Sequence, residues 1–129
     1  MFISGIDQYL QGITNAKVVL ANTNDTTLYT APSASLFNVS IVSSIIACNT
    51  DNSSAVTLSV TVVDTEDTPV TFNLFDVKSI AANTSVELLT RDLVLKSGET
   101  LKVQASAANI HIDAIIQEIT KGNNKNKEN

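Results

Sequence analysis

The chain has 129 residues, enough for one domain with a real core. It is 43% hydrophobic but only 16% charged, whereas a typical soluble domain is about 25% charged, so Ser, Thr and Asn must supply much of its polar surface. Its net charge of −5 argues against a nucleic-acid partner, because such binding depends on neutralised phosphates. The N-terminus has no basic signal-peptide region, and no stretch reaches the roughly 20 apolar residues of a membrane span. We therefore expect a cytoplasmically made protein with no membrane partner.

Residues 1–15 form a segment apart from the rest. Their apolar residues follow a helical spacing, but two glycines within the segment weaken a helix. The sequence therefore predicts a short helix or an extended arm over 1–15, packed either on its own domain or on a neighbouring subunit. Five of its apolar residues are the predicted subunit anchor: Phe2, Ile3, Ile6, Tyr9 and Leu10.

A β-domain is predicted over residues 16–120, beginning with short strands at 17–21 and 26–30. The next strand, 36–48, changes face: Val39 and Ile41 lie on one side, whereas Val42, Ile46 and Cys48 fall on the other. Such a change predicts a bulge, a bend or a strand that is buried on both faces. Cys48 is interpreted as a small buried apolar residue.

Residues 56–62 alternate strictly between aliphatic and hydroxyl side chains, so one face of this strand is apolar and the other polar. Gly98 is expected to give positive φ in the turn at 96–99. Further strands are predicted at 70–74, 86–89, 93–95, 101–105 and 110–119. About eight strands with regular turns indicate an all-β, antiparallel β-sandwich of jelly-roll or Ig-like type. Residues 121–129 form a polar C-terminal tail.

Catalytic and metal-binding patterns are weak. His111 and Asp113 share one face of the last predicted strand, but no nucleophile elbow accompanies them, and a surface His beside an Asp explains the pair. Asp64, Glu66 and Asp67 share one loop, which we interpret as a solvated acidic turn rather than a calcium site. With a single His and a single Cys, the usual zinc sets are excluded. We expect no enzyme, cofactor or metal.

The order of turns and strands resembles a known group. The relevant segments are TLYTAP (27–32), ACNT (47–50) before the alternating strand, LVLKSGETLKV (93–103), ASAAN (105–109) and EIT (118–120). Together they resemble small β-sandwich virion proteins of tailed bacteriophages: head decoration (cement) proteins, head fibres, and neck or tail components. The resemblance covers roughly residues 26–120, leaves the 1–15 segment out, and rests on strand-and-turn patterns rather than on catalytic residues.

This resemblance implies a structural protein located in the virion and made in the host cytoplasm. Its expected partners are the major capsid protein or other virion proteins, and copies of itself, with a trimer as the expected homo-oligomer. A head decoration protein that stabilises the assembled capsid is the leading interpretation. A neck, baseplate or fibre-attachment component is the alternative within the same class.

A carbohydrate- or receptor-binding β-sandwich module is the alternative from another class. Sugar sites usually offer exposed aromatic platforms, and the chain is only 5% aromatic. The available aromatic residues are Phe2, Tyr9, Tyr29, Phe37, Phe72 and Phe75, several of which alternate into the predicted core.

Overall fold

The computed structural model describes residues 9–32, 38–64 and 68–121, which form nine strands and no helix. Within these ranges there is accordingly no helix long and apolar enough to cross a bilayer. The strands are β1 (Tyr9–Val19), β2 (Thr26–Thr30), β3 (Asn38–Asn49), β4 (Val56–Val63), β5 (Thr71–Ile80), β6 (Thr84–Glu87), β7 (Leu93–Lys96), β8 (Thr100–Ala105) and β9 (Ile110–Lys121).

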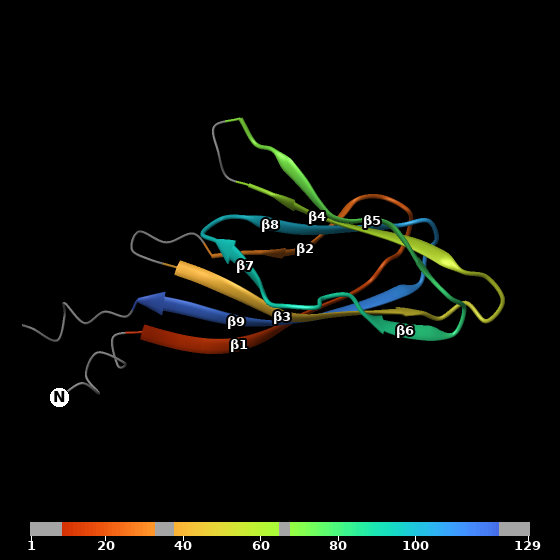
Figure 1. Ribbon diagram of the computed structural model, residues 1–129, viewed down its shortest axis with the longest axis horizontal. Coiled ribbons are helices and arrows are strands. Elements are labelled where there is room, and N and C mark those ends of the chain that lie inside the picture. Colours follow the sequence, from red (N-terminus) through yellow and green to blue (C-terminus); the bar gives the residue numbers. More distant parts are fainter. Residues whose placement is uncertain (1–8, 33–37, 65–67, 122–129) are drawn as a thin grey trace, which may run out of the picture.

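The strands form two antiparallel sheets that stack as the layers of a sandwich (Figure 1). One sheet has the order β1-β9-β3-β6, with β7 also paired to β3, and the other has the order β2-β8-β4-β5. Each early strand thus pairs with its counterpart from the late half: β1 with β9, β2 with β8, β3 with β7 and β6, and β4 with β5. This wrapped double hairpin is a jelly roll, which decides between the two sandwich types that the sequence allowed.

The core lies between the two sheets and is aliphatic. β4 alternates regularly between buried and half-buried residues, as its sequence predicts. The largest fully buried side chains come from both sheets and include Leu58, Leu101, Ile45 and Ile112. Tyr29 and Phe75 only border this core.

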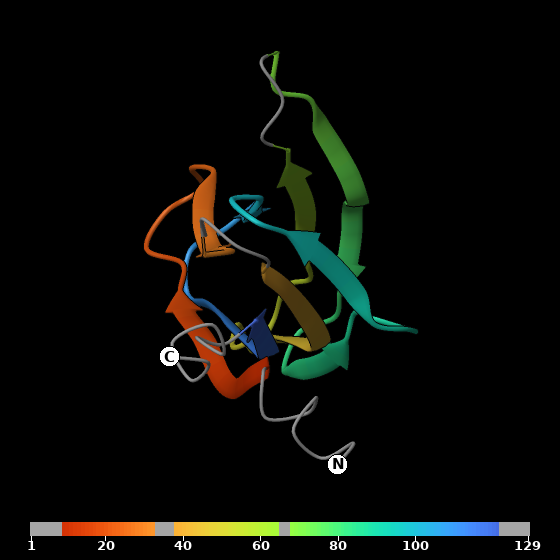
Figure 2. The same ribbon diagram turned by 90° about the vertical axis from the view of Figure 1, so that its left-hand side faces the viewer.

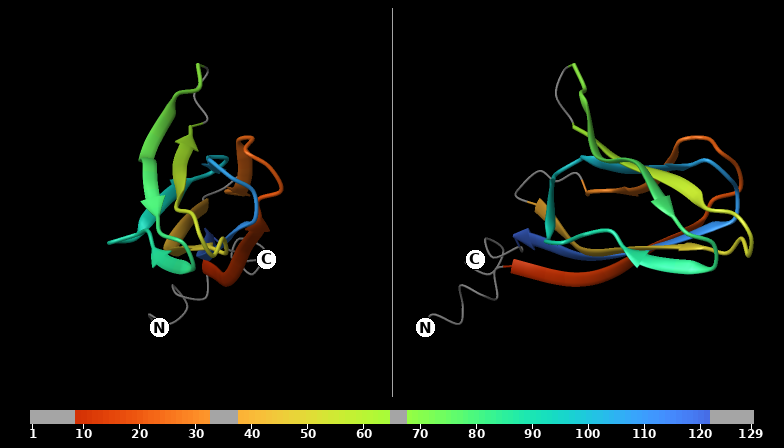
Figure 3. Two further views of the ribbon diagram at one scale, coloured as in Figure 1. Left: turned by 90° about the vertical axis from the view of Figure 1, so that its right-hand side faces the viewer. Right: turned by 45° about the vertical axis from the view of Figure 1, so that its right-hand side comes forward.

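Where it is described, the N-terminal segment takes the extended form of its two predicted alternatives and packs on its own domain. Residues 9–15 belong to β1, which pairs with β9 without a register shift from Tyr9–Lys121 to Val19–His111. A helix is therefore wrong for these residues, and residues 1–8 lie outside the described part. The backbone of β9 pairs with β1 along the whole length of β1. A local count of helical spacing cannot take this distant pairing into account. Figures 2 and 3 show β1 and β9 side by side in one layer.

A register shift in β3 between Val42 and Ser44 shows that, of the predicted alternatives, the change of face is a bulge. The extra residue reverses the alternation, so Ile45 is fully buried and Ile46 points outward. The predicted grouping of Val42 with Ile46 and Cys48 is therefore wrong, because Val42 lies in the core. Cys48 is only half-buried and does not belong to the core.

Polar side chains connect the two sheets at both ends of the sandwich. The Tyr29 hydroxyl on β2 donates to the Glu118 carboxylate on β9 and lies 2.9 Å from the Ser40 hydroxyl on β3. At the other end, the buried Asn49 donates from Nδ2 to the carbonyl oxygens of Ser54 and Ile80, at 2.9 and 3.1 Å. These bonds tie strands of the two layers together.

The predicted turn at 96–99 is confirmed. Gly98 has φ of 82°, and the Glu99 amide donates to the Lys96 carbonyl over 3.0 Å. The Lys96 amide in turn donates to the Glu99 carboxylate at 2.7 Å. A left-handed residue at this position favours glycine because it carries no Cβ.

Candidate functional site

The outer face of the five-stranded sheet is unusually apolar. Its exposed aliphatic side chains are Ile13 (77%), Val19 (50%), Ile46 (39%), Val94 (55%) and Ile115 (37%). We call these five residues the apolar face. They come from β1, β3, β7 and β9, so they form a patch across the sheet rather than isolated exposed residues, and such patches mark interaction sites.

The strand register places these side chains on one side. β9 buries Ile112, Ala114 and Ile116, so the residues between them, among them Asp113 and Ile115, face outward. Directly opposite residues of an antiparallel pair share a face, which puts Val19 beside His111 and Lys17 beside Asp113. The β3 bulge then adds Ile46, opposite Asp113, to the same side.

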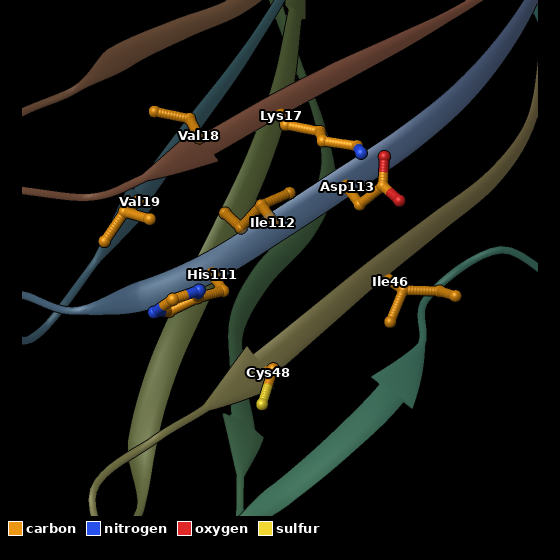
Figure 4. A pocket seen from close by; sticks show the side chains of 8 residues that line it. All are labelled: Lys17, Val18, Val19, Ile46, Cys48, His111, Ile112 and Asp113. Atoms are coloured by element: carbon orange, nitrogen blue, oxygen red, sulfur yellow. The ribbon is translucent and has the colours of Figure 1, made fainter.

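A hollow of about 430 Å³ lies within this surface (Figure 4). β1 contributes Lys17, Val18 and Val19 to its lining, β3 contributes Ile46 and Cys48, and β9 contributes His111, Ile112 and Asp113. Its lining thus combines four aliphatic side chains with the Cys48 thiol and the charged or titratable side chains of Lys17, His111 and Asp113.

Asp113 is the unusual polar group of the hollow. Its Oδ1 atom is shielded from solvent and has no hydrogen-bond partner among the described residues. In Figure 4 the Lys17 side chain extends toward this carboxylate, but the two groups are not close enough to form an ion pair. Among the described residues, the ion pair is the one between Lys102 and Asp25. An unsatisfied buried acceptor costs about 1–3 kcal/mol, so this position favours a hydrogen-bond donor.

The outer face of the four-stranded sheet has the opposite character. β4 turns Thr57, Ser59 and Thr61 outward, and we call this surface the hydroxyl face. The Gln104 amide donates to the Thr23 carbonyl at 3.0 Å, and Lys102 pairs with Asp25 at 3.2 Å. Gln104 and Lys102, on the hydroxyl face, thus have partners within the chain.

Exposed aliphatic and aromatic residues also occur on and near β5. Val77 is 58% exposed and lies beside Thr57 and Ser59. Val70 and Phe72 are half-exposed where the β4–β5 hairpin projects from the body of the sandwich (Figure 1). Phe72 is the one exposed aromatic residue among the side chains whose burial is described, because Tyr29 and Phe75 are partly buried against the core.

The predicted anchor residues lie mostly outside the described part of the chain. Phe2, Ile3 and Ile6 are not described, and Tyr9 and Leu10 are described only as the first residues of β1. Sequence reasoning did not find the apolar face. One available signal was Ile115, which breaks the alternation of Ile110, Ile112, Ala114 and Ile116.

The catalytic and metal candidates do not form a centre in the described residues. His111 and Asp113 share the outer face of β9, as expected for a surface pair. Within the described ranges, His, Cys, Asp and Glu side chains do not cluster in threes as a metal site would need. Glu66 and Asp67, from the acidic loop, lie outside those ranges.

Comparison with known proteins adds structural neighbours only, since the chain matches neither a protein-family model nor a curated protein. The structure of infectious bursal disease virus, Gx strain, aligns with a TM-score of 0.61 at 14% identity, over 92% of this chain and 33% of that chain. The VP2 subviral particle of infectious bursal disease virus aligns with a TM-score of 0.58 at 12% identity, over 92% of this chain and 34% of that chain. The acid-stable capsid structure of Helicobacter pylori bacteriophage KHP30 aligns with a TM-score of 0.51 at 16% identity, over 89% of this chain and 94% of that chain.

These neighbours come from viral particles. The chain spans about a third of the first two and most of the third. At such identities the likeness establishes a shared fold, and a jelly roll serves capsid proteins, lectins and cupins alike.

Proposed function

We propose that this chain is a non-enzymatic structural protein of a virion, which buries its apolar face against a neighbouring subunit of the assembled particle. The apolar face carries the proposal, because five exposed aliphatic residues gather on one sheet surface. The fold shared with chains of viral particles supports it, as does the sequence resemblance to tailed-phage virion proteins.

The specific role that we propose is head decoration. A protein that binds only the assembled lattice adds its binding free energy to that state and so stabilises the shell. Apolar burial would supply the affinity, at about 25 cal/mol for each Å² removed from water. A low surface charge suits this role, because interface cores are depleted in charged residues.

Binding to particles tests the proposal. Purified protein is mixed with heads of its own virus from which this protein is missing, and co-sedimentation is measured. We expect the wild type and Thr61→Lys, which changes the hydroxyl face, to bind equally. Ile115→Lys should bind at least tenfold more weakly, because it places a charge in the buried patch. Equal binding by Ile115→Lys would contradict the proposal, and binding to tails instead of heads would select the neck, baseplate or fibre position.

The predicted N-terminal anchor needs a separate variant. Because β1 begins at Tyr9, a deletion of residues 2–8 removes Phe2, Ile3 and Ile6 and leaves the strand intact. If these residues anchor a neighbouring subunit, the deletion should abolish particle binding while the thermal unfolding temperature stays unchanged. Unchanged binding would assign the contact to the sheet face alone.

A further inference from the structure

We infer that the free edge of β1 pairs with β1 of a second copy, so that the five-stranded sheets of two molecules join into one antiparallel sheet about a two-fold axis. Backbone groups at the sheet edge carry this interaction, so it goes beyond the proposed function of the apolar face. A two-fold contact also differs from the trimer that the resemblance implies.

The hydrogen-bond pattern of β1 shows which of its backbone groups are free. The Leu20 amide donates to the Ile110 carbonyl at 2.9 Å, in the same register as the rest of the β1–β9 pair. Opposite residues of an antiparallel pair alternate between bonded and non-bonded positions, so the even-numbered residues of β1 bond to β9. The odd-numbered residues, from Tyr9 to Val19, therefore turn their N–H and C=O groups toward the free edge.

The neighbouring strands agree with this pattern. The Leu88 amide donates to the Ile45 carbonyl at 2.8 Å, so Ile45 turns its backbone groups toward β6 and Ile46 bonds to β9. Ile46 is paired with Asp113, an odd-numbered residue of β9, which leaves the even-numbered residues of β9 to bond β1. No described strand pairs with the other edge of β1, which is the outermost strand of its layer (Figure 1).

Among the edges of the two described sheets, the edge of β1 is the long and regular one. The opposite edge of its sheet consists of β6 and β7, with four residues each. In the other sheet, β2 has five residues and a register shift, and β5 has two register shifts and a φ of 54° at Val77. Short strands and bulges protect edges from pairing with other chains. β1 instead has eleven residues without a register shift or a proline.

The sequence of β1 also leaves room for a neighbouring strand. From Tyr9 to Ala16 it has no charged residue, and Lys17 is the only charge in the strand. A Cβ atom on Gly12 would meet no atom within 4 Å, and the φ of Gly12 lies outside the left-handed region. Neither packing within the chain nor backbone conformation thus requires this glycine. A glycine inside a strand often marks a place where another backbone approaches closely.

A second copy is the neighbour that fits this edge. The occupant must offer a regular unpaired strand, and each copy of the chain carries one, β1 itself. In a two-fold antiparallel contact, odd-numbered residues pair with odd-numbered residues, so the free backbone groups of both copies are satisfied together. Copies that bind one particle, as proposed above, also meet at a high local concentration.

The register that we infer places Ile13 on the two-fold axis. Ile13 is 77% exposed, more than any other large apolar residue of the described chain, and on the axis it lies opposite Ile13 of the partner subunit. Such cross-strand pairs stabilise a sheet. Asn15 then pairs with Gln11 of the partner subunit, and Lys17 pairs with Tyr9 of the partner subunit. The two Lys17 positions lie roughly 26 Å apart, well beyond the Debye length of about 8 Å at physiological ionic strength.

Two substitutions at one exposed position test the backbone pairing. Asn15 turns its N–H toward the free edge, so Asn15→Pro removes a donor that the fold does not use, and an edge strand tolerates proline in this orientation. Asn15→Thr is the matched control, because it keeps the N–H and supplies a strand-forming side chain. Thermal unfolding checks that both variants fold, and sedimentation velocity over a range of concentrations measures self-association.

We expect the wild type and Asn15→Thr to form, as the concentration rises, a species of twice the 13.7 kDa chain mass. Asn15→Pro should keep the wild-type unfolding temperature and self-associate at least tenfold more weakly. Equal self-association by a folded Asn15→Pro variant would overturn the inference. A wild type that stays monomeric up to its solubility limit, or that forms a trimer, would overturn it as well.

A cross-link tests the register without a change to the backbone. In a Cys48→Ala background, Ile13→Cys places two thiols across the axis at a Cα separation of about 5.5 Å, which a disulfide can span. Val19→Cys lies on the same edge and the same face, but its two copies are roughly 40 Å apart in this register. Diamide should therefore link Ile13→Cys into a covalent dimer at least tenfold faster than Val19→Cys. Equal rates of cross-linking would contradict the pairing.

The inference and the proposed function fail separately. Ile115→Lys changes the apolar face but leaves the free edge of β1 intact, so this variant should lose particle binding and still form the dimer. If Ile115→Lys abolished the dimer too, the copies would meet through the apolar face and the edge contact would be wrong. If the wild type were a monomer and Asn15→Pro lost particle binding, the edge would pair with a strand of another virion protein instead of a second copy.

Discussion

The two sheets bury similar aliphatic side chains between them, but their outer faces differ. On the hydroxyl face, Lys102 and Gln104 have partners within the chain. On the apolar face, Ile46 and Ile115 are exposed and Asp113 Oδ1 has no partner among the described residues. The hydroxyl face exposes one large aliphatic side chain, Val77, whereas the apolar face exposes five, which is the composition of a surface that another molecule covers. A sandwich can therefore leave one side hydrated and use the other for assembly.

The largest expected effect is a difference in stability between substitutions on the inner side and on the outer side of the five-stranded sheet. Ile45 is fully buried, and its neighbour Ile46 is 39% exposed on the apolar face. Ile45→Ala should lower the free energy of unfolding by about 3 kcal/mol, because it opens a cavity in the core. Ile46→Ala should cost less than about 1 kcal/mol in stability while weakening the proposed binding to particles. Urea unfolding and co-sedimentation with particles measure the two effects, and equal destabilisation by both variants would contradict the register at the β3 bulge.

A smaller effect should follow if the hydroxyl face is made apolar. Thr57 and Thr61 point outward from β4 and are half-buried. The double variant Thr57→Val with Thr61→Val keeps the side-chain shape and the β-branching but removes the hydroxyl groups, so the fold should persist. We expect about tenfold stronger self-association than in the wild type, equivalent to about 1.4 kcal/mol. No change in mass would show that apolar character alone does not create an assembly surface on this sandwich.

The hydrogen bond from Tyr29 to Glu118, which connects the two sheets, should be lost at high pH. Burial and the hydrogen bond to Glu118 raise the pKa of Tyr29 to about 12, although the Ser40 hydroxyl acts in the opposite direction. Because the folded pKa lies above the unfolded value of about 10, the stabilisation is complete below pH 10 and disappears as pH rises toward 12. Tyr29→Phe should cost about 1 kcal/mol below pH 10 and should lose this pH dependence. The midpoints of urea unfolding between pH 8 and 12 measure this pH dependence of stability, with Tyr9→Phe as the control.

The smallest expected effect concerns the border of the apolar face. Burial raises the pKa of Glu87, but hydrogen bonds from Ser44 and from the amides of Ile45, Leu89 and Leu88 lower that pKa overall. The carboxylate therefore stabilises the fold above the unfolded pKa of about 4.3, and this contribution is lost as pH falls through the folded pKa. Glu87→Gln should lower stability at pH 7 by less than about 1 kcal/mol, since the group is largely exposed. The difference from wild type should vanish in acid, and a constant difference would contradict this assignment.

Some of the assembly surface could have been inferred from the sequence. Ile115 interrupts the alternation of β9, and the apolar residues of 39–48 occupy both phases. These patterns indicate strands with apolar residues on both faces. They do not tell which face another sheet covers, because that depends on pairing between strands far apart in the chain.

The strands, the main turns and the aliphatic core follow from local sequence patterns, since a period of two residues and a glycine with positive φ are local properties. The other features depend on contacts between strands that are far apart in the chain. Pairing of β1 with β9 extended a strand into the predicted arm, and the order of both sheets selected the jelly roll. The bulge in β3 turned Ile46 outward beside Asp113. Contacts between distant strands fix these features, so no local pattern can show which apolar residues remain uncovered.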